Sequence, residues 1–167
     1  TAGVPAEALY AAVAEAAVRE LDGFKPQELA NTVWAFATAG VPAEALYAAV
    51  AEAAVRSELD GFNPQDLTMM AWAFTHTTAP ADKLLDLLSR EAAKQVDNLQ
   101  IRQLVRLIYS FLKAGTLATA FFHSAAKRLA SHAGRSRIAD AAAKAAASAA
   151  TGEQHSNATL YGLTHPQ

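Results

Sequence analysis

The chain has 167 residues, 52% hydrophobic and 18% charged, a balance that excludes wholesale disorder and suits one compact domain or a short array. It contains no cysteine, which excludes disulfides, thiolate zinc sites and cysteine nucleophiles. The net charge of −2 is unevenly spread: residues 1–80 hold three Lys/Arg against ten Asp/Glu (−7), and residues 81–167 hold eleven against six (+5). The C-terminal half could carry the basic footprint of a nucleic-acid binder, whereas the N-terminal half argues against one.

An internal repeat organises the chain. Residues 1–19 recur letter for letter at 38–56, and a fixed period of 37 to 38 residues predicts a stacked array of like units. A weaker third copy keeps an aromatic pair, Tyr109 and Phe111, at the positions of Trp34 and Phe36. The fourth copy lacks the large side chains of the others, which is typical of a degenerate terminal repeat. The predicted units are 1–37, 38–75, 76–115 and 116–150, followed by an extended tail over 151–167.

Each unit predicts two helices. Pro5 suits the first turn of one helix, Pro26 opens the next, and Gly40 suits the left-handed residue that closes it. Apolar residues recur at spacings of three and four between these signals. Strong helix formers dominate, so the class is all-α. The expected helices cover 5–21, 26–38, 43–59, 64–75, 80–95, 99–114, 117–132 and 136–150.

These helices need one another to form a core. A single helical hairpin cannot bury its apolar stripe, so the hairpins must stack into an α-solenoid of about four repeats. We expect Trp34, Trp72, Phe36 and Phe74 to pack between helices rather than form an exposed stacking platform. No run of 18 apolar residues lacks a charge, so no membrane span is expected.

The second helix of the first unit carries a recognisable signature. Residues 24–40 (FKPQELANTVWAFATAG) resemble the signature of octotricopeptide repeat (OPR) proteins, 38-residue helical-hairpin arrays that are abundant in algal organelles and often found with RAP domains. The resemblance is good over residues 1–76 and loose over 77–115. It implies sequence-selective binding of single-stranded RNA in a chloroplast or mitochondrion, with roughly one base per unit. The chain opens at Thr1 with no signal segment ahead of the first repeat, so we expect a targeting peptide to have been removed.

One stripe of the second helices gathers polar and basic side chains. The third unit places three cations on one helical face, a candidate strip for phosphate contacts, and two later arginines could extend it. A solvated outer face, or a fit to an acidic partner, is the alternative reading. The candidate RNA- or partner-binding residues are Gln27, Asn31, Gln65, Arg102, Arg106, Lys113, Arg135 and Arg137.

The sequence gives no support to catalysis. The five histidines show no metal-ligand spacing, and there is no P-loop, GxGxxG or GxSxG motif. We therefore predict a non-catalytic binding scaffold with no metal, cofactor or small-molecule substrate. Two functions remain open: binding of single-stranded RNA, as the resemblance implies, or a structural or accessory subunit of a large organellar complex (photosynthetic, respiratory or ribosomal) that makes protein–protein contacts.

Overall fold

The computed structural model describes residues 6–133 and 144–148, which contain helices and no strand. The all-α prediction is confirmed. The helices are α1 (Ala6–Glu20), α2 (Pro26–Ala39), α3 (Glu44–Arg56), α4 (Pro64–Thr75), α5 (Asp82–Lys94), α6 (Ile101–Ala114) and α7 (Thr119–Ala133), with short 3₁₀ helices η1 (Leu21–Gly23) and η2 (Val96–Asn98). Residues 144–148 are also helical, but the rest of the helix expected over 136–150 and the tail over 151–167 lie outside the described residues.

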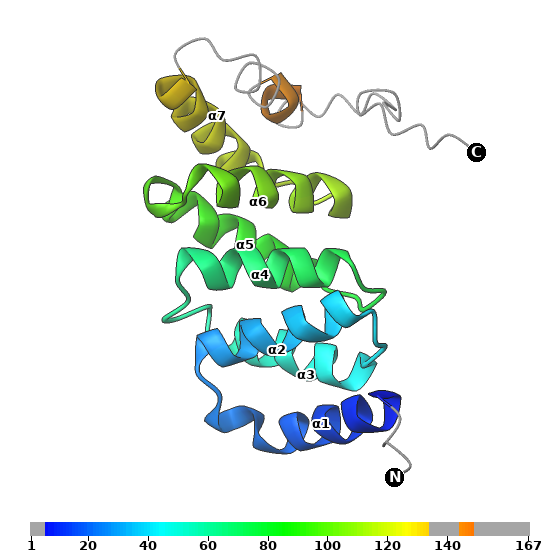
Figure 1. The fold of residues 1–167 in the computed structure, drawn as a ribbon. Helices are drawn as coiled ribbons and strands as arrows, with labels where there is room; N and C mark the ends of the chain where they lie inside the picture. Colours follow the sequence, from blue (N-terminus) through cyan, green and yellow to red (C-terminus); the bar gives the residue numbers. More distant parts are fainter. Residues whose placement is uncertain (1–5, 134–143, 149–167) are drawn as a thin grey trace, which may run out of the picture.

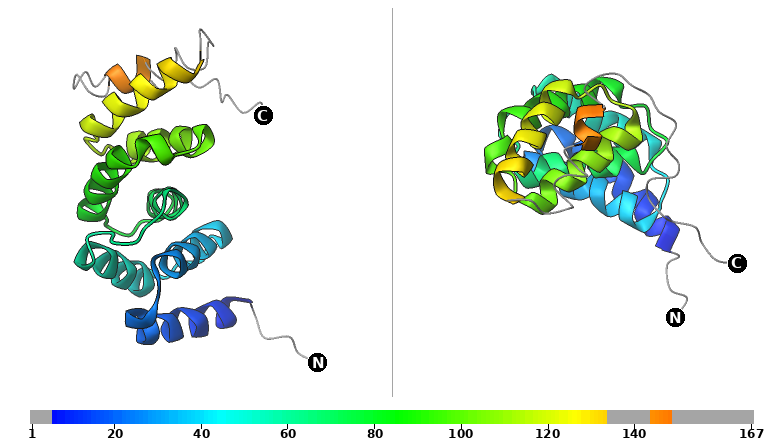
Figure 2. Two further views of the ribbon diagram at one scale, coloured as in Figure 1. Left: turned by 90° about the vertical axis from the view of Figure 1, so that its left-hand side faces the viewer. Right: turned by 90° about the horizontal axis from the view of Figure 1, so that it is seen from above.

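The helices form two stacked columns, as an α-solenoid requires (Figures 1 and 2). The second helices α2, α4 and α6 pack one on the next, and so do the first helices α1, α3, α5 and α7. In addition, α2 packs against α3, α4 against α5, and α6 against α7. α2 and α4 therefore each lie against both helices of the pair that follows. None of the described helices is long and apolar enough to cross a lipid bilayer.

Local signals in the sequence set where the second helices begin and end. Pro26 and Pro64 occupy the first turns of α2 and α4. At the start of α4, the Asn63 side chain accepts hydrogen bonds from the backbone N–H groups of Gln65 (2.8 Å) and Asp66 (3.1 Å), which would otherwise lack a partner. Gly40 closes α2 with φ 65°, the left-handed conformation that glycine adopts at least cost.

An aromatic contact repeats between the two columns. Tyr10 packs edge-on to Phe36 with ring centroids 5.2 Å apart, and Tyr47 packs on Phe74 in the same way at 5.6 Å. Both phenylalanines are buried, which confirms the prediction that they pack between helices. The same contact at equivalent positions shows that the first and second pairs share one packing scheme.

Candidate nucleic-acid interface

One side of the column of second helices is built from equivalent positions of three repeats. On α2 these positions are spaced i, i+4, i+7 and i+11, which places them on a single face of the helix. The same four positions recur on α4 and on α6. We call this surface the second-helix face; it comprises Gln27, Asn31, Trp34 and Thr38 of α2, Gln65, Met69, Trp72 and His76 of α4, and Arg102, Arg106, Tyr109 and Lys113 of α6.

A row of aromatic rings crosses the middle of the second-helix face. Trp34 of α2 and Trp72 of α4 have ring centroids 6.5 Å apart. His76, which follows the last residue of α4, stacks on Trp72 at 4.2 Å and lies 6.4 Å from Tyr109 of α6. Trp34 is 37% exposed and Tyr109 50% exposed, whereas Trp72 and its neighbours shield one another. Solvent therefore reaches aromatic side chains on α2 and α6, and reaches Trp72 of α4 in part.

A hydrogen bond fixes the central ring of this row. His76 Nδ1 lies 2.8 Å from the Trp72 carbonyl oxygen, which can only accept, so Nδ1 carries the proton and donates. The bond holds the imidazole nearly parallel to the indole of Trp72, with 22° between the ring planes. The two rings thus form a rigid stack, and a rigid platform loses little conformational entropy when it binds a flat ligand.

The cations lie at the α6 end of the second-helix face. Arg102, Arg106 and Lys113 are all exposed, on the same side of α6 as Tyr109. Within residues 6–133 and 144–148, none of the three makes an ion pair or a side-chain hydrogen bond. Cations that are not neutralised by neighbouring carboxylates are available to phosphate groups.

The structure brings six of the eight predicted site residues together on this face. They are Gln27, Asn31, Gln65, Arg102, Arg106 and Lys113, and all six are exposed. The remaining two, Arg135 and Arg137, lie outside the described residues. Of the other positions in the predicted stripe, Thr38 and His76 are exposed, whereas Met69 is 9% exposed and closes the gap between α2 and α4.

The prediction that Trp34 and Trp72 pack between helices is confirmed for their mutual contact, but the expectation that neither forms an exposed surface is wrong for Trp34. The two indoles do contact each other across α2 and α4, but Trp34 leaves more than a third of its surface to solvent. The exposure of Trp34 could have been predicted from its position in the sequence. Trp34 stands three residues after Asn31 and four before Thr38, so it belongs to the polar stripe and not to the apolar one that contains Val33 and Phe36.

The surface has the two components that proteins use to hold single strands of nucleic acid. Aromatic side chains stack on bases of any sequence, and nearby cations contact the phosphate backbone. No cluster of three or more His, Asp or Glu side chains with metal-binding geometry occurs in the described part of the chain.

The fold and this surface define a helical-repeat protein with one aromatic and basic face. The family model of the RNA-editing substrate-binding complex 6 protein (RESC6) matches residues 1–145, and the chain belongs to that family. Neither the curated proteins nor the solved structures contain a match to the chain. The matched family is thus named for RNA editing and is not the OPR family that residues 24–40 resemble. The OPR resemblance also implies a connection with RNA.

Proposed function

We propose that this protein is a non-catalytic component of an RNA-editing complex and that its second-helix face holds single-stranded RNA. The name of the matched family supports the place in an RNA-editing complex. The resemblance of residues 24–40 to the OPR signature supports single-stranded RNA as the ligand, and an organelle, mitochondrion or chloroplast, as the compartment. RNA and the other subunits of the complex are the partners in this proposal.

The observation that carries the proposal is the aromatic row. Trp34, Trp72 and Tyr109 stand at one repeat position on α2, α4 and α6. The ring centroids of Trp34 and Trp72 are 6.5 Å apart, and His76, which stacks on Trp72, lies 6.4 Å from Tyr109. An aromatic at a fixed repeat position gives one stacking surface per helix pair, as in readers that take one base per repeat. The exposed cations of α6 then supply phosphate contacts at one end of the strand.

Loss of an exposed ring should weaken RNA binding. Stacking of a base on an aromatic side chain contributes about 1–3 kcal/mol, so Trp34→Leu and Tyr109→Leu are each expected to raise the Kd for a mixed-sequence single-stranded RNA by about 10-fold. Fluorescence polarisation with a labelled oligonucleotide at modest ionic strength measures the change. A duplex of the same length should bind less well, because its bases are already stacked on one another.

The chain offers an internal reporter and a matched control. Both of its tryptophans lie on the second-helix face, so quenching of tryptophan fluorescence on RNA addition reports on that face alone. Leu9→Ala removes an exposed apolar side chain from α1, in the other column, and should leave the Kd unchanged. The proposal fails if the protein does not bind single-stranded RNA, or if Trp34→Leu and Tyr109→Leu bind it as tightly as the unmodified chain.

An accessory role through protein–protein contacts is the second candidate. Residues 1–80 carry a charge of −7, which disfavours RNA over that half, and α1 exposes Leu9 and Val13 to solvent. A subunit held in a complex by such contacts would co-purify with other proteins from its native source. Recovery of the native protein as a free monomer would contradict this candidate.

A further inference from the structure

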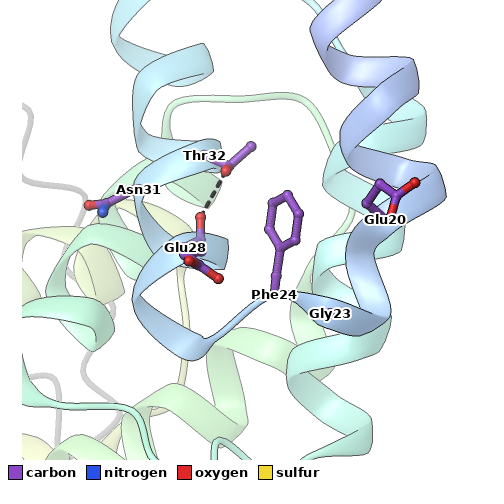
Figure 3. Close-up of a pocket in the computed structure, with 6 residues that line it drawn as sticks. All are labelled: Glu20, Gly23, Phe24, Glu28, Asn31 and Thr32. Atoms are coloured by element: carbon purple, nitrogen blue, oxygen red, sulfur yellow. Dashed lines mark hydrogen bonds between the residues drawn. The ribbon is translucent and has the colours of Figure 1, made fainter.

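The first helix pair has an open groove where the second pair has none. A groove of about 460 Å³ lies between α1 and α2, lined by Leu9, Tyr10, Val13, Asn31, Thr32, Ala35 and Phe36. A second pocket of about 530 Å³ continues it from Asn31 and Thr32 toward η1, past the ring of Phe24 (Figure 3). No residue of α3 or α4 is among those that line the two pockets.

The sequence duplication allows a direct comparison of this groove with its counterpart. Because residues 1–19 and 38–56 are identical, Leu9 and Val13 of α1 have the same neighbours in sequence as Leu46 and Val50 of α3. Their surroundings differ: Leu9 and Val13 are 58% and 45% exposed, whereas Leu46 and Val50 are 1% and 0% exposed. The difference arises from what covers the helix and not from the helix itself.

The second wall of the groove shows the same contrast. Ala35 of α2 is exposed and Thr32 is half-buried, whereas their counterparts on α4, Ala73 and Met70, are fully buried. The counterpart groove between α3 and α4 is therefore closed on both sides, and the occupant must touch both of these helices.

α1 packs against α3, and α2 is the helix that packs against both α3 and α4. The buried residues Ala30 and Val33 of α2 contribute to the shared core. The Tyr47 hydroxyl donates to the Val33 carbonyl oxygen at 3.4 Å, which ties α3 to the inserted helix. Small and β-branched side chains on the inserted helix allow its backbone to approach closely.

Close contacts at the two turns support the same comparison. A Cβ placed on Gly61, in the turn between α3 and α4, would lie 3.3 Å from Pro26 Cγ of α2. A Cβ placed on Gly23, in the turn between α1 and α2, would meet no atom within 4 Å apart from its chain neighbours, although this turn is one residue shorter and Gly23 lacks the positive φ of Gly61. Arg56 of α3 forms an ion pair with Asp22 of the preceding turn at 3.7 Å, whereas its counterpart Arg19 has no carboxylate partner among the described residues.

A titratable group also differs in burial between the two pairs. Asp66 of α4 is 2% exposed, and burial raises the pKa of its carboxyl above the ordinary value, while the backbone N–H of Asn63 acts in the opposite direction. Its counterpart Glu28 of α2 is exposed and lines the pocket in Figure 3. In the first pair, the surface equivalent to the one that α3 and α4 pack against α2 is therefore exposed.

We propose that the groove between α1 and α2 is a docking site for a further helix of this repeat's second-helix type, which enters as α2 enters between α3 and α4. The occupant presents small apolar residues at the positions of Ala30, Val33 and Ala37, together with an acidic group that reaches Arg19. Of the second-helix face, only Asn31 lines this docking site. The tests below measure the packing of α1 and not RNA binding, so either proposal can fail without the other.

The duplication also provides the test. Residues 1–5 and 38–42 are both TAGVP, so a copy of residues 1–37 fused ahead of Thr1 recreates the connection between α2 and α3. In this extended chain, amide hydrogen exchange in α1 should slow by at least about 10-fold, toward the rates of α3. Leu9→Ala should then lower the urea midpoint as Leu46→Ala does, although it has little effect in the original chain.

A second extended chain is the control. It carries glutamate at the position of the fused segment that copies Val33, so the added helix cannot seat in an apolar groove, and α1 should exchange as in the original chain. The proposal is overturned if exchange in α1 is the same in the original and extended chains, or if Leu9→Ala remains harmless in the extended chain. Absence of added helical signal in circular dichroism would also count against it, because the fused segment has the sequence of a pair that folds here.

Discussion

Leu46→Ala is expected to lower the free energy of unfolding by about 3 kcal/mol, whereas Leu9→Ala changes it by less than about 0.5 kcal/mol. Leu46 is buried between α3 and the preceding pair, so its truncation leaves a cavity, while Leu9 is exposed on α1 and leaves none. Urea unfolding followed by circular dichroism measures both values. Because repeat arrays can unfold in parts, amide exchange in α1 and α3 should be recorded alongside.

This pair of substitutions contains its own control. The two leucines stand in the same 19-residue sequence, so helix propensity and the local properties of the unfolded chain are matched. Their surroundings differ in the preceding helix pair and in the facing helix, where Thr32 of α2 corresponds to Met70 of α4. Equal losses at Leu9 and Leu46 would contradict the packing scheme, in which each helix pair covers the apolar residues of the next.

Removal of the α6 cations should change the salt dependence of RNA binding. Each cation that contacts a phosphate of a single strand contributes about 0.7 to the slope of log K against log salt. The triple variant Arg102→Gln, Arg106→Gln and Lys113→Gln is therefore expected to reduce the magnitude of that slope by about 2. Affinity should fall by a similar factor for all sequences, because phosphate contacts do not distinguish bases.

The control for the triple variant removes the same charge from the other column. Lys83→Gln, Arg90→Gln and Lys94→Gln lie on exposed positions of α5 and lower the net charge by the same amount. Two of these side chains form exposed ion pairs, with Asp86 and Glu91, which contribute little to stability. Equal slopes for the two triple variants would mean that α6 makes no particular contact with RNA.

The fold was predictable because its signals are local. Pro26 and Pro64 open helices and Gly40 closes one by backbone geometry, which does not depend on distant residues. The period of the repeat then determines that like helices stack on like. The ends of the first helices were less predictable: α3 ends at Arg56, earlier than the expected residue 59, because Glu58 and Leu59 adopt positive φ values in the turn that follows.

Burial was not predictable at the same level. The apolar stripe of the first helix correctly marks Leu46 and Val50 as core, but the same letters at Leu9 and Val13 are exposed. Periodicity indicates which side of a helix is apolar, whereas the neighbour that covers it is a property of the array. For this reason no sequence pattern within residues 1–19 could separate the two copies.

The candidate site was predictable in part for a related reason. Helical spacing correctly grouped Gln27 and Asn31 on one face and placed Arg102 and Arg106 on the equivalent face of α6. The exposure of Trp34 was missed because a large aromatic at helical spacing is buried in most proteins. Trp34 is exposed because it lies within the polar stripe of α2. Its role in binding stays a prediction.

Photocrosslinking of a short single-stranded RNA to the protein, with the adducts located by mass spectrometry, tests the central claim most directly. The account predicts base adducts on Trp34, Trp72 or Tyr109, the aromatic row of the second-helix face. Adducts confined to the first helices α1, α3 and α5, with none on α2, α4 or α6, would contradict it.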